Sequence, residues 1–196
     1  MNTHILLLAA GSSSRMGQSK QLMKIQGIPM LVHAVREAAA ACPNVTVVLG
    51  SEADAHREVL KGLRVNTIEN SEWQRGMGNS LKYGLAALRD AHPEMDAVLV
   101  MVCDQPAVSA GHLKKILALA EHSSRPVTAS SYKETLGVPA LFRRELFDSL
   151  AVIADSAGAS KLVRKHASPA DTIPLIGGET DLDTINDYLQ FTGRYE

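Results

Sequence analysis

Residues 6–20 read LLLAAGSSSRMGQSK, an apolar strand that runs directly into a loop rich in glycine and serine, and this junction decides the fold class. Gly11 and Gly17 allow backbone conformations that a Cβ would forbid, so successive N–H groups of the serines between them converge readily on an anion. Arg15 adds a planar guanidinium that holds two phosphate oxygens, and Lys20 adds a compact ammonium. A loop of this kind after a first strand predicts a phosphate-binding site in an α/β protein.

The loop matches neither of two common phosphate-binding motifs. A Walker A loop has four residues between its glycines and then Lys-Ser/Thr, whereas five residues separate Gly11 from Gly17 and the lysine follows only at Lys20. The dinucleotide fingerprint G-x-G-x-x-G requires a second glycine where Ser13 stands. The alternative is a glycine-rich surface turn, but the position directly after a first strand favours ligand binding.

Composition limits the class of protein and its partners. The chain has 196 residues, of which 45% are hydrophobic and 21% charged, and this predicts one globular domain over residues 1–196. A net charge of −1 without a long basic run excludes nucleic acid as the main partner. Cys42 and Cys103 form no C-x-x-C motif, which argues against a thiolate metal site and favours a reduced cytoplasm. The apolar run of residues 5–10 is too short for a signal peptide or a membrane span, so no membrane association is expected.

Apolar runs typical of strands alternate with segments typical of helices, a pattern that predicts an α/β fold with a mostly parallel sheet covered on both faces. Strands are expected at residues 4–9, 45–49, 65–68, 97–102, 127–130 and 138–142. Helices are expected at residues 29–41, 54–60, 80–90, 112–122 and 185–191. Pro29 begins the first of these helices, Ser109 precedes the fourth, and Asp183 or Thr184 is the N-cap of the last.

The stretch VLVMVCDQP, residues 98–106, predicts a second part of the site. Residues 98–102 are apolar on both faces, as in a central parallel strand, so Asp104 emerges at the carboxyl end. Because the carboxyl ends of parallel strands share one edge of the sheet, Asp104 is expected near the loop of residues 9–20. A hard carboxylate oxygen opposite a phosphate loop suits Mg²⁺, whereas the alternative is a turn that Asp104 caps together with Pro106.

Two further segments carry candidate ligand groups. Asp183 in GGETDLDTINDYL, residues 177–189, is a candidate second carboxylate for the metal, and the alternative is a plain helix N-cap. Asn79 and Ser80 in RGMGNS, residues 75–80, carry an amide and a hydroxyl that suit a base edge, and the alternative is an ordinary helix start.

These motifs together resemble the MobA-like nucleotidyltransferase family. The loop L-A-A-G-x-S-x-R-M-G with Lys20 resembles the family's signature loop, and the resemblance continues in the family's order through RGMGNSL, CDQP, G-x-P and DLDT-x-x-DY at residues 75–81, 103–106, 137–139 and 181–188. Ala9-Ala10-Gly11 and Asp104-Gln105-Pro106 look more like the molybdenum cofactor cytidylyltransferase branch (MocA type) than the guanylyltransferase branch, which typically has Leu-Ala-Gly-Gly. The resemblance covers nearly the whole chain. It implies a single MobA-like NTP transferase domain with a three-layer Rossmann-like fold around a mostly parallel central sheet.

The reaction that the resemblance implies is attack by the terminal phosphate of the molybdopterin cofactor on the α-phosphorus of CTP, which releases pyrophosphate. A phosphate monoester has a second pKa of about 6 and is already anionic at neutral pH, so no general base is needed. The enzyme must instead supply alignment and charge neutralisation, with Mg²⁺ as the expected cofactor. CTP and the molybdopterin cofactor are the expected partners, and a transient contact with a molybdoenzyme or its chaperone is a further expectation.

The resemblance also implies roles for residues of the matching motifs. Arg15, Lys20 and Asp104 are the expected catalytic residues, and Asp104 and Asp183 are the expected ligands of Mg²⁺. The expected nucleotide-binding residues are Ala9, Ala10, Gly11, Ser12, Ser13, Arg15, Lys20, Gly78, Asn79 and Ser80.

At two positions this sequence differs from what is usual in one branch of the family or the other. Ala10 stands where the guanylyltransferase branch usually has glycine, and its Cβ predicts a preference for the smaller base of CTP over that of GTP. Asp155 is separated from Gly158 by one residue more than is usual in relatives of the cytidylyltransferase branch, so Asp155 is left out of the site. Gly158, Ala159 and Lys161 stay candidates for an acceptor pocket.

The sequence also allows functions other than cytidylyl transfer. Within enzymes they are GTP-dependent transfer to the same cofactor and transfer to another small phosphate acceptor. From other classes they are an oxidoreductase and a non-catalytic module that binds a nucleotide or cofactor. The missing dinucleotide fingerprint argues against the oxidoreductase, and paired carboxylates opposite a cationic loop argue against a pure binding module.

Overall fold

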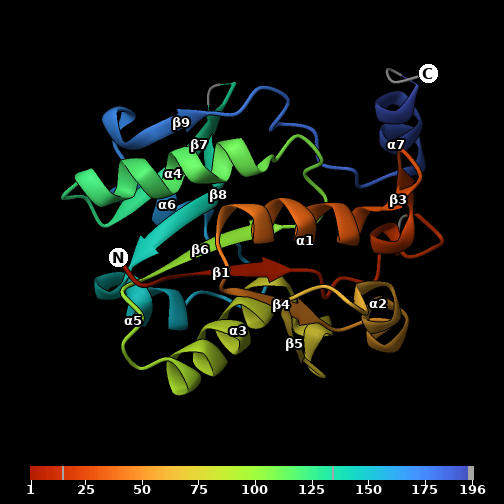
Figure 1. Ribbon diagram of the computed structural model, residues 1–196, viewed down its shortest axis with the longest axis horizontal. Coiled ribbons are helices and arrows are strands. Elements are labelled where there is room, and N and C mark those ends of the chain that lie inside the picture. Colours follow the sequence, from red (N-terminus) through yellow and green to blue (C-terminus); the bar gives the residue numbers. More distant parts are fainter. Residues whose placement is uncertain (15, 134, 194–196) are drawn as a thin grey trace.

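A seven-stranded sheet forms the centre of the molecule (Figure 1). The computed structural model describes residues 1–14, 16–133 and 135–193. Within them the strand order is β5-β4-β1-β6-β8-β7-β9, and only β8 runs antiparallel to its neighbours. The strands are β1 (Thr3–Leu8), β4 (Val45–Leu49), β5 (Asn66–Glu69), β6 (Ala97–Val102), β7 (Val127–Tyr132), β8 (Thr135–Arg143) and β9 (Thr172–Pro174). The predicted mostly parallel sheet is confirmed.

Helices cover both faces of this sheet and give the three predicted layers (Figure 1). One face is covered by α1 (Met30–Ala41), α2 (Ala53–Leu60) and α4 (Ala110–His122). The other face is covered by α3 (Met77–Ala91), α5 (Phe147–Ala151) and α6 (Ser160–His166). Apolar residues of each set of helices pack with the sheet into a separate buried cluster.

Strand β1 shows why the two clusters form. Ile5 and Leu7 belong to the cluster under α1, whereas Leu6 and Leu8 belong to the cluster under α3. Successive side chains of a strand point to opposite faces, so a strand that is apolar throughout must be covered on both sides. Burial of each such leucine or isoleucine contributes about 1.5–3 kcal/mol.

The C-terminal helix α7 (Ile185–Thr192) packs over a small hairpin of β2 (Lys24–Ile25) and β3 (Ile28–Pro29). Ile25, Met30 and Leu182 form the buried centre of this contact, and the Tyr188 hydroxyl donates to the Lys24 carbonyl at 2.6 Å. The chain segment before α7 is thereby held beside the segment that follows the glycine- and serine-rich loop.

Several elements differ from the sequence prediction. Helix α3 begins at residue 77 rather than 80, so the RGMGNS segment already forms its first turn. The pattern did not predict α5, α6 or β9, because elements of three to seven residues are too short to show a hydrophobic period. The 3-10 turns are η1 (Lys20–Leu22), η2 (Trp73–Arg75), η3 (Arg144–Leu146) and η4 (Pro169–Asp171).

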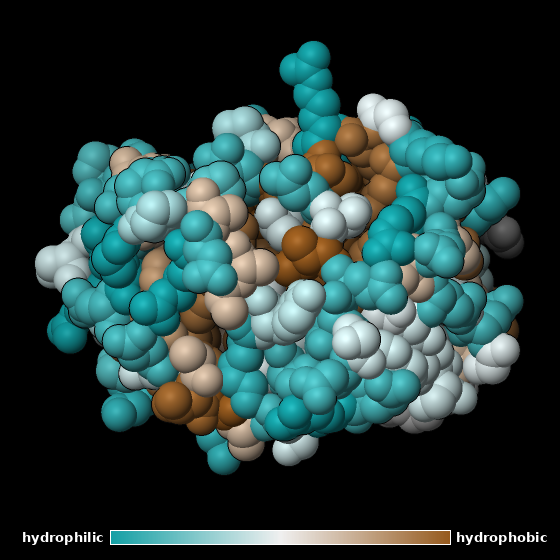
Figure 2. All heavy atoms as spheres, turned by 90° about the horizontal axis from the view of Figure 1, so that it is seen from below, coloured by the Kyte–Doolittle hydropathy of each residue, from teal (hydrophilic) through white to brown (hydrophobic). Residues whose placement is uncertain are grey.

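The outer surface over α3 and α5 is mostly hydrophilic, and its apolar side chains are interrupted by polar ones (Figure 2). This is the polar face of amphipathic helices whose other side is buried against the sheet. Among the residues that the structure describes, none of the helices has the length and apolar character that crossing a bilayer requires.

Candidate active site

A pocket of about 240 Å³ opens at the carboxyl ends of β1 and β6. These neighbouring strands mark the switch point of the sheet, because the chain passes from β1 outward to β4 and β5 and then returns to β6 on the other side. The pocket is lined by the predicted residues Ala9, Ala10, Gly11, Ser12, Lys20, Ser80 and Asp104. Segments that are far apart in the sequence therefore meet where α/β proteins usually bind ligands.

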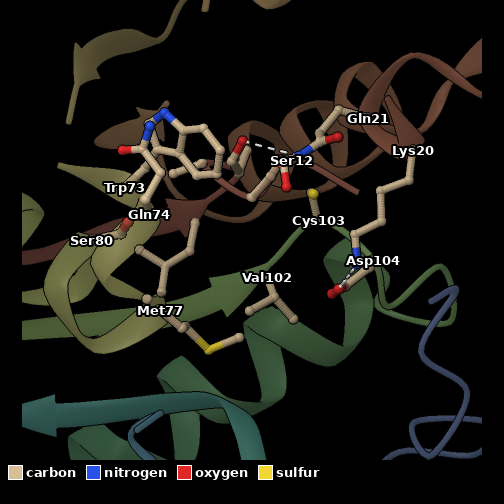
Figure 3. A pocket seen from close by; sticks show the side chains of 15 residues that line it. Ser12, Lys20, Gln21, Trp73, Gln74, Met77, Ser80, Val102, Cys103 and Asp104 are labelled. Carbon is tan, nitrogen blue, oxygen red and sulfur yellow. Dashed lines mark hydrogen bonds and ion pairs between the residues drawn. The ribbon is translucent and has the colours of Figure 1, made fainter. Parts of the chain in front are cut away.

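Lys20 connects the two carboxylates that were predicted as metal ligands. Figure 3 shows its contact with Asp104. Its Nζ lies 2.5 Å from Asp104 Oδ2 and 3.0 Å from Asp183 Oδ1. The side chains of Lys20 and Asp104 are only 13% and 15% exposed. Burial alone would lower the pKa of Lys20, but the charge and hydrogen bond of Asp104 outweigh it, so the pKa is raised and Lys20 stays a cation.

Asp183 is available for this contact because Thr184, and not Asp183, caps helix α7. The Thr184 hydroxyl accepts from the Asp187 N–H at 3.2 Å, and the Asp187 carboxylate accepts from the Thr184 N–H at 2.8 Å, which completes a capping box. The Leu182 N–H also donates to the Asp104 carbonyl at 3.0 Å. The segment of Asp183 is thus fixed by its helix on one side and by the β6 loop on the other.

A third carboxylate, that of Asp181, lies beside this pair and was not among the predicted ligands. It lines an adjoining pocket of about 420 Å³ together with Asp104, Asp183 and Tyr132. Burial raises the pKa of Asp181 to about 6, and the charges of Asp104 and Asp183 act in the same direction. The alternation Asp181-Leu182-Asp183 was the signal in the sequence. The Asp183 N–H donates to the Asp181 carbonyl at 3.0 Å, and this tight turn brings both carboxylates to the same pocket.

The donor set fits a hard divalent cation. Asp104 Oδ1 is buried and has no hydrogen-bond partner among residues 1–14, 16–133 and 135–193. In the same part of the chain no group of three or more His, Cys, Asp or Glu side chains is arranged to hold a metal by itself. Mg²⁺ is typically bound by one or two carboxylates together with substrate phosphates and water, which is the arrangement that these residues allow.

Gln21 holds the loop after β1 in shape, a role that sequence reasoning missed. Its buried amide donates to the carbonyls of Gly11 at 2.8 Å and Ala9 at 3.2 Å. Its Oε1 accepts from the hydroxyls of Ser13 at 3.0 Å and Ser19 at 2.9 Å. A buried glutamine that satisfies both ends of its amide in this way fixes the loop before any ligand arrives.

Ser13 also takes part in this arrangement. Its φ of 54° lies in the left-handed region, and its hydroxyl accepts from the Lys20 N–H at 3.0 Å. The Ser13 side chain therefore stabilises the loop, and Ser12, Ser13 and Ser14 all line the adjoining pocket. The predicted catalytic residue Arg15 lies outside the residues that the structure describes.

Asn70 organises the opposite wall of the pocket. Its amide Nδ2 donates to Asn79 Oδ1 at 2.9 Å and to Ser80 Oγ at 3.0 Å, and all three residues are buried. Ser80 lines the pocket, as predicted, whereas the amide oxygen of Asn79 is already used within the protein. A nucleotide contact by Asn79 stays a prediction.

Gly78 packs against the loop between α5 and α6. Its N–H donates to the Asp155 carbonyl at 2.8 Å, and a Cβ at this position would lie 2.2 Å from the carbonyl oxygen of Ala154. The Asp155 carboxylate pairs with Lys82 and with Arg75, and their hydrogen bonds lower the pKa of Asp155. Asp155 thus fixes the start of α3 through its backbone carbonyl and its carboxylate. A direct contact of Gly78 with nucleotide stays a prediction.

We expect Gly78→Ala to reduce the free energy of unfolding by about 1–3 kcal/mol, because the added methyl group meets rigid backbone. Gly111→Ala is the matched control, since Gly111 is also the second residue of a helix and its nearest contact would be at 3.8 Å. That control should change stability by no more than about 1 kcal/mol, in the stabilising direction. Denaturant unfolding followed by circular dichroism measures both values, and equal stability of the two variants would contradict the packing role.

Cys103 lines the pocket beside Asp104, and its thiol is buried. Burial raises the pKa of the Cys103 thiol to about 12, and the Asp104 carboxylate adds to the shift. The thiolate is the reactive form, so a thiol of this pKa is inert near neutral pH.

Comparisons with known proteins bear on this arrangement. A family model described as the MobA-like NTP transferase domain matches residues 5–170. These residues include the loop after β1, the start of α3 and the end of β6.

Curated relatives carry different named activities. Nicotine blue oxidoreductase of Paenarthrobacter nicotinovorans is 29% identical over 195 residues, with 92% of this chain and 91% of that protein covered. A probable molybdenum cofactor guanylyltransferase of Synechococcus elongatus is 34% identical over 117 residues, with 58% of this chain and 56% of that protein covered. The bifunctional protein GlmU of Koribacter versatilis is 28% identical over 88% of this chain, and the chain spans only 32% of its length.

Solved structures share the whole fold. Rv0371c from Mycobacterium tuberculosis H37Rv superimposes with a TM-score of 0.81 at 28% sequence identity, and the match covers 98% of each chain. The sheet, its two helical layers and the edge that carries the pocket are therefore common to both chains.

Proposed function

The chain belongs to the family of MobA-like NTP transferase domains, and on this premise we propose that it transfers a cytidylyl group from CTP to the terminal phosphate of the molybdopterin cofactor. The observation that carries the proposal is the meeting of Lys20, Asp104 and Asp183 beside a glycine- and serine-rich loop in the adjoining pocket of about 420 Å³. A cation and two carboxylates placed in this way suit a metal-bound triphosphate better than they suit a neutral ligand.

For this reaction the protein must position the acceptor phosphate against the α-phosphorus of CTP and neutralise the negative charge of the phosphates. An oxygen of the acceptor phosphate forms a bond to the α-phosphorus of CTP, the bond from that phosphorus to the bridging oxygen breaks, and pyrophosphate leaves with the electron pair. The acceptor is already anionic at neutral pH because its second pKa is about 6, so no general base is required. This agrees with a pocket whose cysteine is an inert thiol and whose lysine stays charged.

The charged residues and the loop after β1 have distinct roles in the proposed reaction. Lys20, and Arg15 with it, neutralises negative charge on the α-phosphate and on the leaving pyrophosphate. Asp104 and Asp183 would hold Mg²⁺, which supplies charge neutralisation at the triphosphate when it is bound. The loop that Gln21 braces presents backbone N–H groups to the phosphates without further ordering.

Selection between CTP and GTP is assigned to the wall that Ala10 and Ser80 line. The Cβ of Ala10 leaves less space for a purine base than the glycine that is usual in the guanylyltransferase branch. The Ser80 hydroxyl adds to the selection, because a base that cannot hydrogen-bond with it leaves polar groups unpaired. Transfer from GTP is the second candidate, because the guanylyltransferase of Synechococcus elongatus is 34% identical over 117 residues.

A nucleotide panel tests the proposal. Pyrophosphate release is measured with CTP, GTP, ATP and UTP in the presence of Mg²⁺, with and without molybdopterin cofactor. We expect release only with the acceptor, and kcat/KM for CTP about 10-fold or more above that for GTP. In Ala10→Gly this ratio should fall while transfer is retained.

Two results would overturn parts of the proposal. A kcat/KM for GTP equal to or above that for CTP would replace the cytidylyl assignment and leave nucleotidyl transfer standing. No pyrophosphate with any nucleotide, together with reduction of nicotine blue by electrons from a supplied reduced nicotinamide cofactor, would favour the activity named for the Paenarthrobacter relative.

A further inference from the structure

Trp73 stands in the wall of the pocket, and it is the only tryptophan of the chain. It is the first residue of η2, which leads into α3, and its side chain is half-buried. Figure 3 shows Trp73 and Ser80 on one side of the pocket, with Lys20 and Asp104 on the other. A flat aromatic side chain and a buried ion pair thus define two ends of the same cavity.

Close packing fixes Trp73 in this place. A Cβ on Gly50 would lie 2.7 Å from both the Ala10 carbonyl oxygen and the Trp73 Cβ, so glycine alone lets the tryptophan lie against the loop after β1. The Asn70 N–H donates to the Leu49 carbonyl at 2.8 Å, and Asn70 Oδ1 accepts from the Glu72 N–H at 3.0 Å. The backbone that leads into η2 is therefore fixed by hydrogen bonds, and the Trp73 Cβ lies close against Gly50, before a ligand binds.

We propose that Trp73 is the stacking surface for the nucleobase, an inference that rests on the proposed nucleotide-dependent function. The phosphates of a nucleoside triphosphate belong at Lys20 and at the metal ligand Asp104, which leaves the base for the opposite end of the pocket. Met77 lies on the same side of the pocket as Trp73 (Figure 3), Leu8 also lines the pocket, and apolar side chains of this kind suit a flat aromatic group.

The role assigned to Trp73 differs from base selection. Stacking on an aromatic side chain tolerates every base, because every base has a π-face, and it contributes mainly to affinity. Trp73 accordingly increases the affinity for CTP and GTP alike, whereas Ala10 and Ser80 distinguish between them.

Fluorescence gives a direct test, because the emission of tryptophan reports on this one position. The wild-type protein is titrated with CTP, with GTP and with inorganic tripolyphosphate in the presence of Mg²⁺, and binding of each is measured independently by calorimetry. Both nucleotides should quench the emission on binding, and tripolyphosphate should bind without quenching. Equal quenching by tripolyphosphate, or nucleotide binding without quenching, would overturn the proposal.

Variants separate stacking from bulk. Trp73→Leu keeps an apolar side chain without a π-face and should weaken binding of CTP and GTP by about 10-fold to 100-fold, with tripolyphosphate affinity unchanged. Trp73→Phe should retain most of the affinity. Tyr83→Ala, which removes an aromatic ring that is 45% exposed on α3, is the matched control and should bind as the wild type does.

The binding measurements distinguish a failure of the proposed function from a failure of the stacking role of Trp73. No binding of any nucleotide to the wild-type protein would count against the proposed function itself. Normal nucleotide affinity in folded Trp73→Leu, with binding intact in the wild type, would remove only the stacking role.

Discussion

Asp104→Asn is expected to lower kcat for pyrophosphate release by about 10²-fold or more at saturating nucleotide. The substitution keeps the size of the side chain but removes its negative charge, which balances the Lys20 ammonium at 2.5 Å. A neutral amide is also a weaker ligand for a divalent cation than the carboxylate, whose buried Oδ1 has no hydrogen-bond partner in the described part of the chain. Initial rates at fixed Mg²⁺, with thermal unfolding as the check on folding, measure the effect.

Asp148→Asn is the control for this prediction, because that carboxylate is 89% exposed and pairs with Arg89 on the surface, away from the pocket. Its turnover should equal that of the wild type. Near wild-type turnover of Asp104→Asn would show that Asp104 is not the metal ligand. Asp183→Asn should also reduce turnover, and helix α7 should stay intact because Thr184 caps it.

Lys20→Ala is expected to reduce kcat by about 10²-fold or more, with a smaller change in KM for CTP. The ammonium stabilises charge that redistributes in the transition state, so its loss falls mainly on the rate. The variant also leaves Asp104 and Asp183 without the cation that lies between them. Full steady-state kinetics over a range of CTP concentrations separate the two parameters.

Two further variants make this test specific for the position of the charge. Lys20→Arg keeps the charge, but its planar guanidinium does not occupy the space of a compact ammonium between two carboxylates, so it should restore little activity. Lys61→Ala, at an ammonium that is 73% exposed, should have no effect. Wild-type kinetics in Lys20→Ala would place this lysine outside the reaction.

The parts of the fold that were predictable are those with long and regular patterns. All six residues of β6 and the last four of β1, residues 5–8, are apolar on both faces, a pattern that a parallel sheet covered on both sides explains. Helices α5 and α6 escaped prediction because five and seven residues do not complete two turns of an amphipathic pattern.

The site was predictable where topology alone brings residues together. Asp104 follows a central strand, and the geometry of parallel strands places it beside the loop of Lys20. The roles of Gln21 and Asn70 were not predictable, because a polar side chain that is buried by a hydrogen-bond network looks in sequence like any surface residue. Trp73 was missed for the opposite reason, since an isolated aromatic residue is usually part of a core.

The antiparallel strand β8 has a consequence for how this protein could diversify. β7 ends and β8 begins at the sheet edge that carries the pocket, with Tyr132 paired to Thr135, and both Tyr132 and Val138 line the adjoining cavity. A connection of this kind needs no crossover helix, so residues can be added between the two strands without changing the register of the sheet. The reach of this wall over the pocket can therefore vary by insertion, while the residues at the ends of β1 and β6 stay as they are.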